Sequence, residues 1–100
     1  MIRHIVMFKF KESAEGRGKA GNIGGLKAML EALPSRIEEI RSFEVGVNFL
    51  AANVAYDVVL VSEFESVEAL YSYQKHPDHL KVADFVSKAC TSRAVVDYVI

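Results

Sequence analysis

The chain has 100 residues, of which 51% are hydrophobic and 25% charged, and its 12 basic and 13 acidic side chains leave a net charge of −1. This length and composition exclude a disordered chain and predict a single globular domain over residues 1–100 with its own core. The balanced charge, with no basic tract, argues against a nucleic-acid partner and against adhesion to an anionic membrane surface.

The first predicted element is a strand over residues 2–11 that is buried on both faces. Both faces carry apolar side chains: Val6, Phe8 and Phe10 share one with His4, and Ile5 and Met7 lie on the other. Its apolar run is far shorter than the roughly 20 residues that a membrane span needs, and it is too short for a signal peptide. We therefore expect a cytoplasmic protein that has no membrane partner.

A polar stretch with five glycines follows, over residues 12–25. Gly16, Gly18 and Gly21 spell G-x-G-x-x-G, which is formally the dinucleotide fingerprint. A chain this short, with one helix between its first two strands, lacks the adjacent parallel strands of a nucleotide-binding crevice. We therefore predict a mobile loop here, which could act as a lid.

Helical spacing of apolar residues begins at Ile23 and continues to Leu33, where Pro34 stops the helix. A strand is predicted over residues 37–49, and a loop follows through residue 53. The clearest strand of the chain is Tyr56 to Phe64, again with apolar residues on both faces: Val58, Leu60 and Phe64 on one, Val59 and Val61 on the other.

Two helices separated by a proline come next. Ser66 is a candidate N-cap for the first of them, and Pro77 fits the first turn of the second. The lone cysteine, Cys90, continues the apolar stripe of the second helix, so we interpret it as a small buried hydrophobe rather than a reactive thiol. The last predicted strand is Arg93 to Ile100.

This order, βαββαβ, predicts an α+β, ferredoxin-like fold with a four-stranded antiparallel sheet. Right-handed crossovers place both helical segments on one face of the sheet. The opposite face would remain apolar, with Ile5, Met7, Val59 and Val61 on it. A patch of that size is rarely left uncovered, so we predict a homodimer that packs sheet against sheet and forms a dimeric α+β barrel.

Polar side chains converge on the helix-covered face of this fold. Tyr73 and His79 lie on the apolar stripes of their helices, so both should point toward the sheet face that bears His4, Val6 and Phe8. Asp97 lies near the end of the last strand, which should run antiparallel beside the first and bring this carboxylate to His4. One interpretation is structural, because buried tyrosines and histidines commonly satisfy a single hydrogen bond and do nothing more.

The other interpretation is a small enclosed pocket. There His79 could act as a general base, while the Tyr73 hydroxyl binds a carbonyl or enolate oxygen; this chemistry needs no cofactor. A metal site built from His76, Asp78 and His79 is disfavoured, because near-consecutive residues around a proline turn rarely aim three ligands at one point.

Four segments carry a resemblance to a known family: residues 3–11 (RHIVMFKFK), 64–68 (FESVE), 76–79 (HPDH) and 96–98 (VDY). Together they resemble the stress-responsive α/β-barrel family, often called Dabb, over nearly the whole chain. The resemblance implies a ferredoxin-like fold and a dimeric α+β barrel. Most members of that family have no established reaction.

Some members, chiefly a plant polyketide cyclase, carry out a cofactor-free aldol cyclisation with a tyrosine and the second histidine of the H-P-x-H turn. By resemblance these correspond to Tyr73 and His79, with His4 and Asp97 similar to other pocket-lining residues. Two functions therefore remain open. One is a dimer that binds a small apolar or carbonyl ligand, with His4, Val6, Phe8 and Asp97 in contact with it; the other is a cofactor-independent cyclase, lyase or isomerase with His79 and Tyr73 as catalytic residues.

Overall fold

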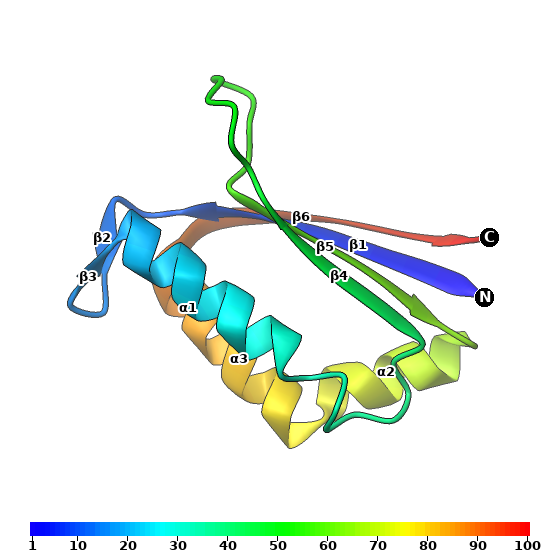
Figure 1. Ribbon diagram of the computed structural model, residues 1–100. Coiled ribbons are helices and arrows are strands. Elements are labelled where there is room, and N and C mark those ends of the chain that lie inside the picture. The colour runs from blue at the N-terminus through cyan, green and yellow to red at the C-terminus, as the bar shows by residue number, and fades with distance from the viewer.

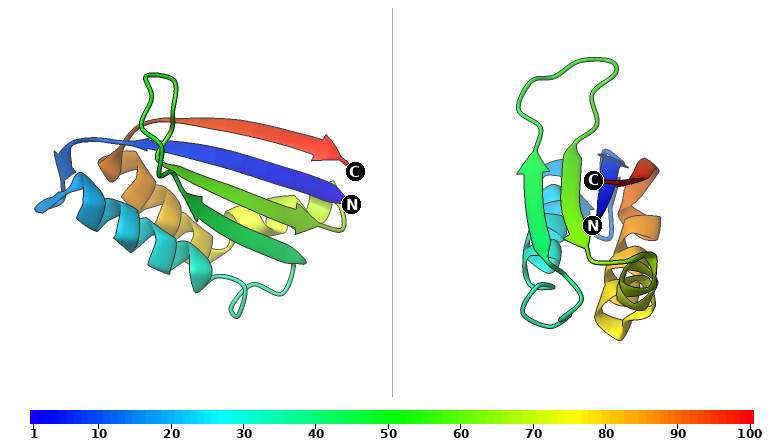
Figure 2. Two further views of the ribbon diagram at one scale, coloured as in Figure 1. Left: turned by 45° about the horizontal axis from the view of Figure 1, so that its top comes forward. Right: turned by 90° about the vertical axis from the view of Figure 1, so that its right-hand side faces the viewer.

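A four-stranded antiparallel sheet carries three helices on one face in the computed structural model, which describes residues 1–100 (Figure 1). The elements in chain order are β1 (Ile2–Phe10), β2 (Ser13–Ala14), β3 (Arg17–Gly18), α1 (Lys19–Glu31), β4 (Ser42–Val47), β5 (Val58–Phe64), α2 (Val67–Lys75), α3 (Pro77–Ala89) and β6 (Cys90–Val99). The strand order in the sheet is β4-β5-β1-β6, and β2 pairs with β3 alone. The predicted ferredoxin-like α+β fold is confirmed, with all three helices on the same side of the sheet (Figure 2).

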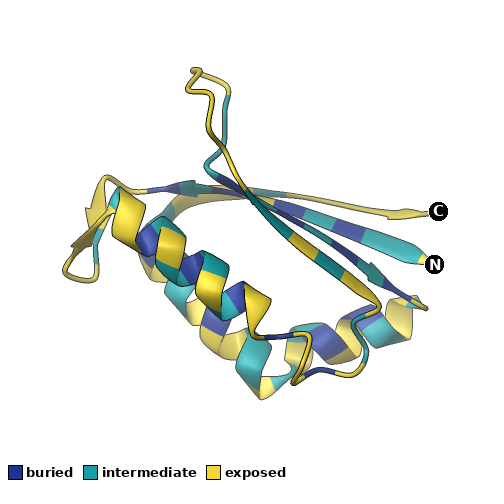
Figure 3. Cartoon of the chain, in the orientation of Figure 1, coloured by how far each residue is buried: buried dark blue, intermediate teal, exposed yellow.

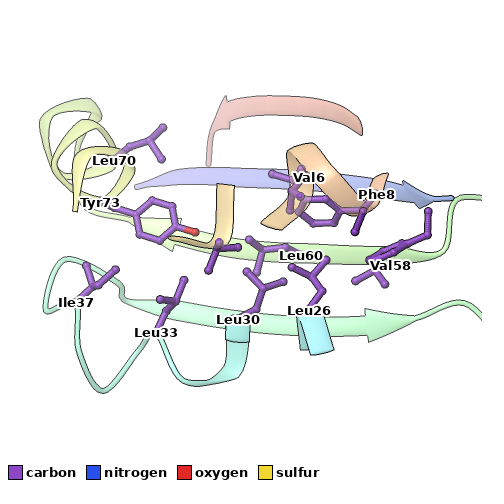
Figure 4. Packing of buried hydrophobic residues seen from close by; sticks show 14 of the residues in the cluster. Val6, Phe8, Leu26, Leu30, Leu33, Ile37, Val58, Leu60, Leu70 and Tyr73 are labelled. Atoms are coloured by element: carbon purple, nitrogen blue, oxygen red, sulfur yellow. The ribbon is translucent and has the colours of Figure 1, made fainter. Parts of the chain in front are cut away.

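The two central strands, β1 and β5, follow the predicted alternation. They run antiparallel with Val6 opposite Leu60 and Phe8 opposite Val58. Every second residue of β5, and of β1 from His4 onward, faces the helices and is buried, whereas the residues between them are more exposed. These rows pack against Leu26 and other helix residues in one core (Figure 4), and the buried positions of sheet and helices face each other (Figure 3).

Residues 12–25 form regular structure, so the prediction of a mobile loop or lid is wrong. Glu15 and Gly16 both adopt positive φ, at 52° and 76°, and thereby close a tight β2–β3 hairpin. The buried Asn22 fixes this hairpin to α1, because its Nδ2 donates to the carbonyl oxygen of Ala14 at 2.9 Å. The short hairpin carries no apolar alternation from which a strand could be predicted.

Helix α1 begins at Lys19, several residues before the predicted start near Ile23. Glycine in a helix costs about 1 kcal/mol relative to alanine, which is why the sequence predicted a loop here. The buried amide of Asn22, which donates to the Ala14 carbonyl, offsets that cost and stabilises the first turns of the helix.

Strand β4 is shorter than the predicted strand of residues 37–49. Ile37 is buried, but in a turn after α1, where its amide donates to the Leu33 carbonyl at 2.9 Å. At the other end, Phe49 lies in the β4–β5 loop and is 96% exposed. Ile37 and Phe49 therefore fit the alternation of a strand, but neither residue pairs with a neighbouring strand.

The two helices after β5 begin as predicted. Ser66 is the N-cap of α2, and its hydroxyl accepts a hydrogen bond from the Ala69 amide at 3.1 Å. Pro77 occupies the first turn of α3, and the N-cap residue is His76, whose Nδ1 accepts from the Asp78 amide at 3.1 Å. The last strand begins at Cys90, earlier than the predicted Arg93, because its pairing with β1 extends to Phe10.

The face of the sheet away from the helices has no covering element within the chain. Met7 and Val96 lie on this face and are 37% and 58% exposed. From the same side of the molecule the β4–β5 loop, residues 48–57, projects as an arm, and Phe49 and Val54 are exposed on it (Figures 1 and 2). None of the three helices combines the length and apolar character that crossing a membrane requires.

Candidate ligand-binding and active site

A cavity of about 350 Å³ lies between the sheet and α3. Most of its walls are apolar, and the polar groups come from β1, α2, α3 and β6. The lining residues are His4, Val6, Phe8, Leu30, Leu60, Tyr73, Gln74, His79, Leu80, Val82, Ala83, Val86, Arg93 and Val95. A concave apolar site of this size with a few convergent polar groups is typical of small-molecule binding sites.

Tyr73 reaches the cavity from the inner face of α2. Its side chain is only 1% exposed, and its hydroxyl points toward the middle of the core (Figure 4). No protein group hydrogen-bonds to this hydroxyl, and burial alone raises its pKa well above the usual value of 10. Tyr73 is therefore a protonated hydrogen-bond donor at neutral pH, and the donor is free for a ligand.

His79 faces Tyr73 from the first turn of α3, with the ring centroids 4.5 Å apart and the planes at 58°. Its Nδ1 lies 3.0 Å from the backbone oxygen of Gln74. Because a carbonyl oxygen only accepts hydrogen bonds, Nδ1 carries the proton and donates it, which leaves Nε2 as the unprotonated nitrogen of the neutral ring.

Burial is also the main influence on the basicity of His79. Desolvation lowers the pKa of His79 below its usual 6.5; the Gln74 carbonyl opposes this shift, and nearby basic groups, including Arg93, add to it. The ring is therefore neutral at pH 7. A neutral imidazole with a free Nε2 beside a protonated phenol can accept a proton and can stabilise an oxyanion.

His4 and Asp97 meet across the β1–β6 pair, as the antiparallel register requires. The two residues are directly opposite each other, and His4 Nδ1 hydrogen-bonds to Asp97 Oδ1. His4 is 5% exposed and lines the cavity, whereas Asp97 lies outside the lining and hydrogen-bonds to the histidine. The carboxylate thus orients the His4 ring, in the way that carboxylates commonly orient functional histidines.

Of the residues predicted for the site, the structure brings five to the cavity wall: His4, Val6, Phe8, Tyr73 and His79. It places the sixth, Asp97, behind His4. Arg93, which was not among the predicted residues, lies opposite Phe8 and faces the helices. Its signal was the alternation of the last strand, which places Arg93, Val95 and Asp97 on one face.

The other candidate groups are separate from this cavity. His76 is an N-cap, and no three His, Cys, Asp or Glu side chains gather in the geometry of a metal site. The glycines of the G-x-G-x-x-G segment lie in the hairpin and in α1. The strand before them, β1, has antiparallel neighbours on both sides, unlike the parallel strands of a dinucleotide-binding crevice. Cys90 is half-buried rather than buried, and desolvation raises the pKa of its thiol to about 11, as expected for an unreactive cysteine.

Comparison with known proteins points to one family and one fold. The Dabb family, described as the stress responsive A/B barrel domain, matches residues 2–100. An uncharacterised protein of Streptomyces coelicolor is 35% identical over 79 residues, which are 79% of each chain.

Two solved structures are also similar. A dimeric protein of unknown function with a ferredoxin-like fold, from Bacteroides fragilis, is 32% identical with a TM-score of 0.86, over 99% of this chain and 95% of that one. A hydroxynitrile lyase from Passiflora edulis has a TM-score of 0.80 over 99% of this chain and 92% of that one, but at 22% identity it shares the fold alone.

Proposed function

Since the chain belongs to the stress responsive A/B barrel domain family and is similar to a solved dimeric protein of unknown function, we propose that it is a homodimer that binds a small apolar or carbonyl ligand. The observation that carries this proposal is the cavity between the sheet and α3. It leaves the Tyr73 hydroxyl and His79 Nε2 without protein partners while apolar side chains surround them. A polar pair of this kind fits a carbonyl oxygen, and the apolar walls fit the remainder of a small molecule.

Filling the cavity is expected to abolish ligand binding. Ala83 lines the cavity from α3, so Ala83→Trp should weaken the binding of acetophenone at least tenfold, as followed by amide chemical-shift changes in a titration. The matched control is Ala28→Trp, because Ala28 is exposed on α1 and does not line the cavity. Saturable shifts around the cavity in the wild type and the control, but not in Ala83→Trp, support the proposal. Unchanged binding by Ala83→Trp would exclude this cavity as the site.

The open face of the sheet supports the homodimer. Ile5 lies between Val61 and Val96 across the three strands, and Met7 lies between Val59 and Ala94, so the apolar surface is continuous. A hollow of about 490 Å³ lies beside it between the sheet and the arm, lined by Met7, Gly46, Val47, Asn48, Phe49, Val54, Ala55, Tyr56, Val58 and Val59. A second copy related by a two-fold axis would cover this surface with an identical one.

We also propose a cytoplasmic location, which the state of the single thiol supports. Cys90 has no second cysteine in the chain with which to form a disulfide. Disulfides persist in oxidising compartments, whereas thiols are kept reduced in the cytosol. A protein that is stabilised by its core, with a single free thiol, suits the reducing compartment.

A second candidate function is cofactor-free carbonyl chemistry at the same site. His79 Nε2 would remove a proton from the carbon next to a carbonyl, the bonding pair would form the enolate, and the Tyr73 O–H would hydrogen-bond to the enolate oxygen. The enolate would then take up a proton, or would add to a second carbonyl in a cyclisation. The free Nε2, the lowered pKa of His79 and the free Tyr73 hydroxyl favour this candidate.

Tyr73→Phe tests the oxyanion part of this chemistry. We expect deuterium uptake into the methyl group of acetophenone in D2O, followed by proton NMR, to slow by about 10²- to 10³-fold, because one buried donor to the enolate is lost. The melting temperature should change little, since the hydroxyl hydrogen-bonds to no protein group. A rate equal to that of the wild type would remove Tyr73 from the mechanism.

A further inference from the structure

Arg93 places a positive charge at the cavity. It lies on β6 directly opposite Phe8, so it shares the helix-facing side of the sheet with the cavity residues. It lines the cavity together with Val95, the next residue of β6 on that side. Arg93 is itself exposed, which places its guanidinium where the cavity meets solvent.

This charge has no acidic partner in the protein. Arg93 takes part in none of the ion pairs of the protein, each of which joins two other residues. The carboxylate on its own face of β6 is Asp97, about 13 Å away along the strand, and that side chain is occupied by His4. On the facing helix, Asp84 pairs with Lys88 at 3.1 Å.

The two ends of the cavity therefore differ in chemistry. The end near Tyr73 and His79 offers a neutral donor and a neutral base, as described above. The end near Arg93 offers an unpaired guanidinium, whose planar donors match a carboxylate in two parallel hydrogen bonds. Between them the walls are apolar, formed by Val6, Val82 and Val86 among others.

We infer that Arg93 binds a carboxylate of the ligand, so that the ligand is a small keto acid with its carboxylate at Arg93, an apolar middle and its carbonyl at Tyr73 and His79. This inference rests on the proposed binding function and adds the chemical class of the ligand. One guanidinium suits a singly charged carboxylate better than a phosphate, which usually gathers several donors. The positive charge of Arg93 acts on the groups of the cavity, since it contributes to the lowered pKa of His79.

The test compares an acid with its neutral ester. The probes are 4-acetylbenzoate and its methyl ester, titrated by calorimetry at pH 7.5 against the wild type, Arg93→Gln, Arg93→Lys and Lys81→Gln. We expect the wild type to bind the acid about tenfold more tightly than the ester, as one charge-assisted contact allows. Arg93→Gln should bind both probes with the affinity that the wild type shows for the ester, and Arg93→Lys should retain part of the preference.

Lys81→Gln is the matched control, because it removes one positive charge from the exposed side of α3 without touching the cavity. It should keep the full preference for the acid. The inference is overturned if the wild type binds both probes equally, if Arg93→Gln keeps the preference, or if Lys81→Gln loses it. Cavity binding survives those outcomes, since the ester still binds, whereas no binding of either probe to the wild type overturns the proposed function and this inference with it.

Discussion

Val59→Glu is expected to convert the proposed homodimer into a folded monomer at micromolar concentration. Val59 lies near the centre of the open sheet face, directly opposite Met7 on β1 and Gly46 on β4. A glutamate there would have to be buried without a partner when two sheets pack together, at a cost of several kcal/mol. In the monomer the same side chain remains in water, so the fold itself should tolerate the change.

Light scattering coupled to gel filtration measures this effect. We expect the dissociation constant of the dimer to rise by at least about 1000-fold, which corresponds to about 4 kcal/mol. The matched control is Val67→Glu, the same substitution at an exposed position in the first turn of α2, where a negative charge also favours the helix dipole. A wild type that is monomeric at micromolar concentration, or a Val59→Glu variant that remains dimeric, would contradict the sheet-to-sheet homodimer.

Loss of His79 should have the largest effect on the carbonyl chemistry. We expect His79→Ala to lower the rate of deuterium uptake into acetophenone by about 10²- to 10⁴-fold, because the general base is gone. The same change also removes the hydrogen bond from Nδ1 to the Gln74 carbonyl, so some loss of stability, about 1 kcal/mol, accompanies it.

His79→Asn separates the two roles of the ring. The amide nitrogen of asparagine can take the place of Nδ1 and donate to Gln74, but it supplies nothing in place of Nε2. We therefore expect His79→Asn to lose the exchange activity while it keeps more of the melting temperature than His79→Ala. If both variants melt well below the wild type and both retain the exchange rate, the ring is structural and the assigned base is excluded.

The pH profile of the wild type gives an independent readout of the same group. Burial lowers the pKa of His79 below 6.5, so the midpoint at which Nε2 takes up a proton lies below that pH. The exchange rate should therefore decline in acidic solution, with a midpoint below pH 6.5. A midpoint above pH 6.5 would point to another base.

Much of the fold follows from local pattern. The alternation in β1 and β5 reflects burial of one face under the helices, and Ser66 and Pro77 mark helix starts through interactions within a few residues. The errors lie where a side-chain hydrogen bond outweighs backbone propensity. The Nδ2 of Asn22 donates to the Ala14 carbonyl, and this bond stabilises a hairpin and a helix start that the glycines disfavour.

The candidate site likewise combines residues that the sequence pattern predicts with features that it does not. Tyr73 and His79 could be predicted from their helical stripes, and the meeting of His4 with Asp97 from the antiparallel order of the first and last strands. Alternation along the last strand already places Arg93 on the face of Asp97, but its position opposite Phe8, at the cavity, depends on the register with β1. The cavity is equally invisible in the sequence, since its volume depends on how far α3 lies from the sheet.

The hydrogen bond between His79 Nδ1 and the Gln74 carbonyl has a stereochemical consequence. Gln74 lies in the last turn of α2, and its carbonyl therefore accepts from outside the helix. A ring anchored in this way cannot turn over without breaking that bond, so Nε2 approaches a flat enolate from one side only. With the enolate oxygen held by the Tyr73 hydroxyl, proton transfer at a prochiral carbon in this cavity would therefore be enantioselective, and a backbone oxygen would help to set the selectivity.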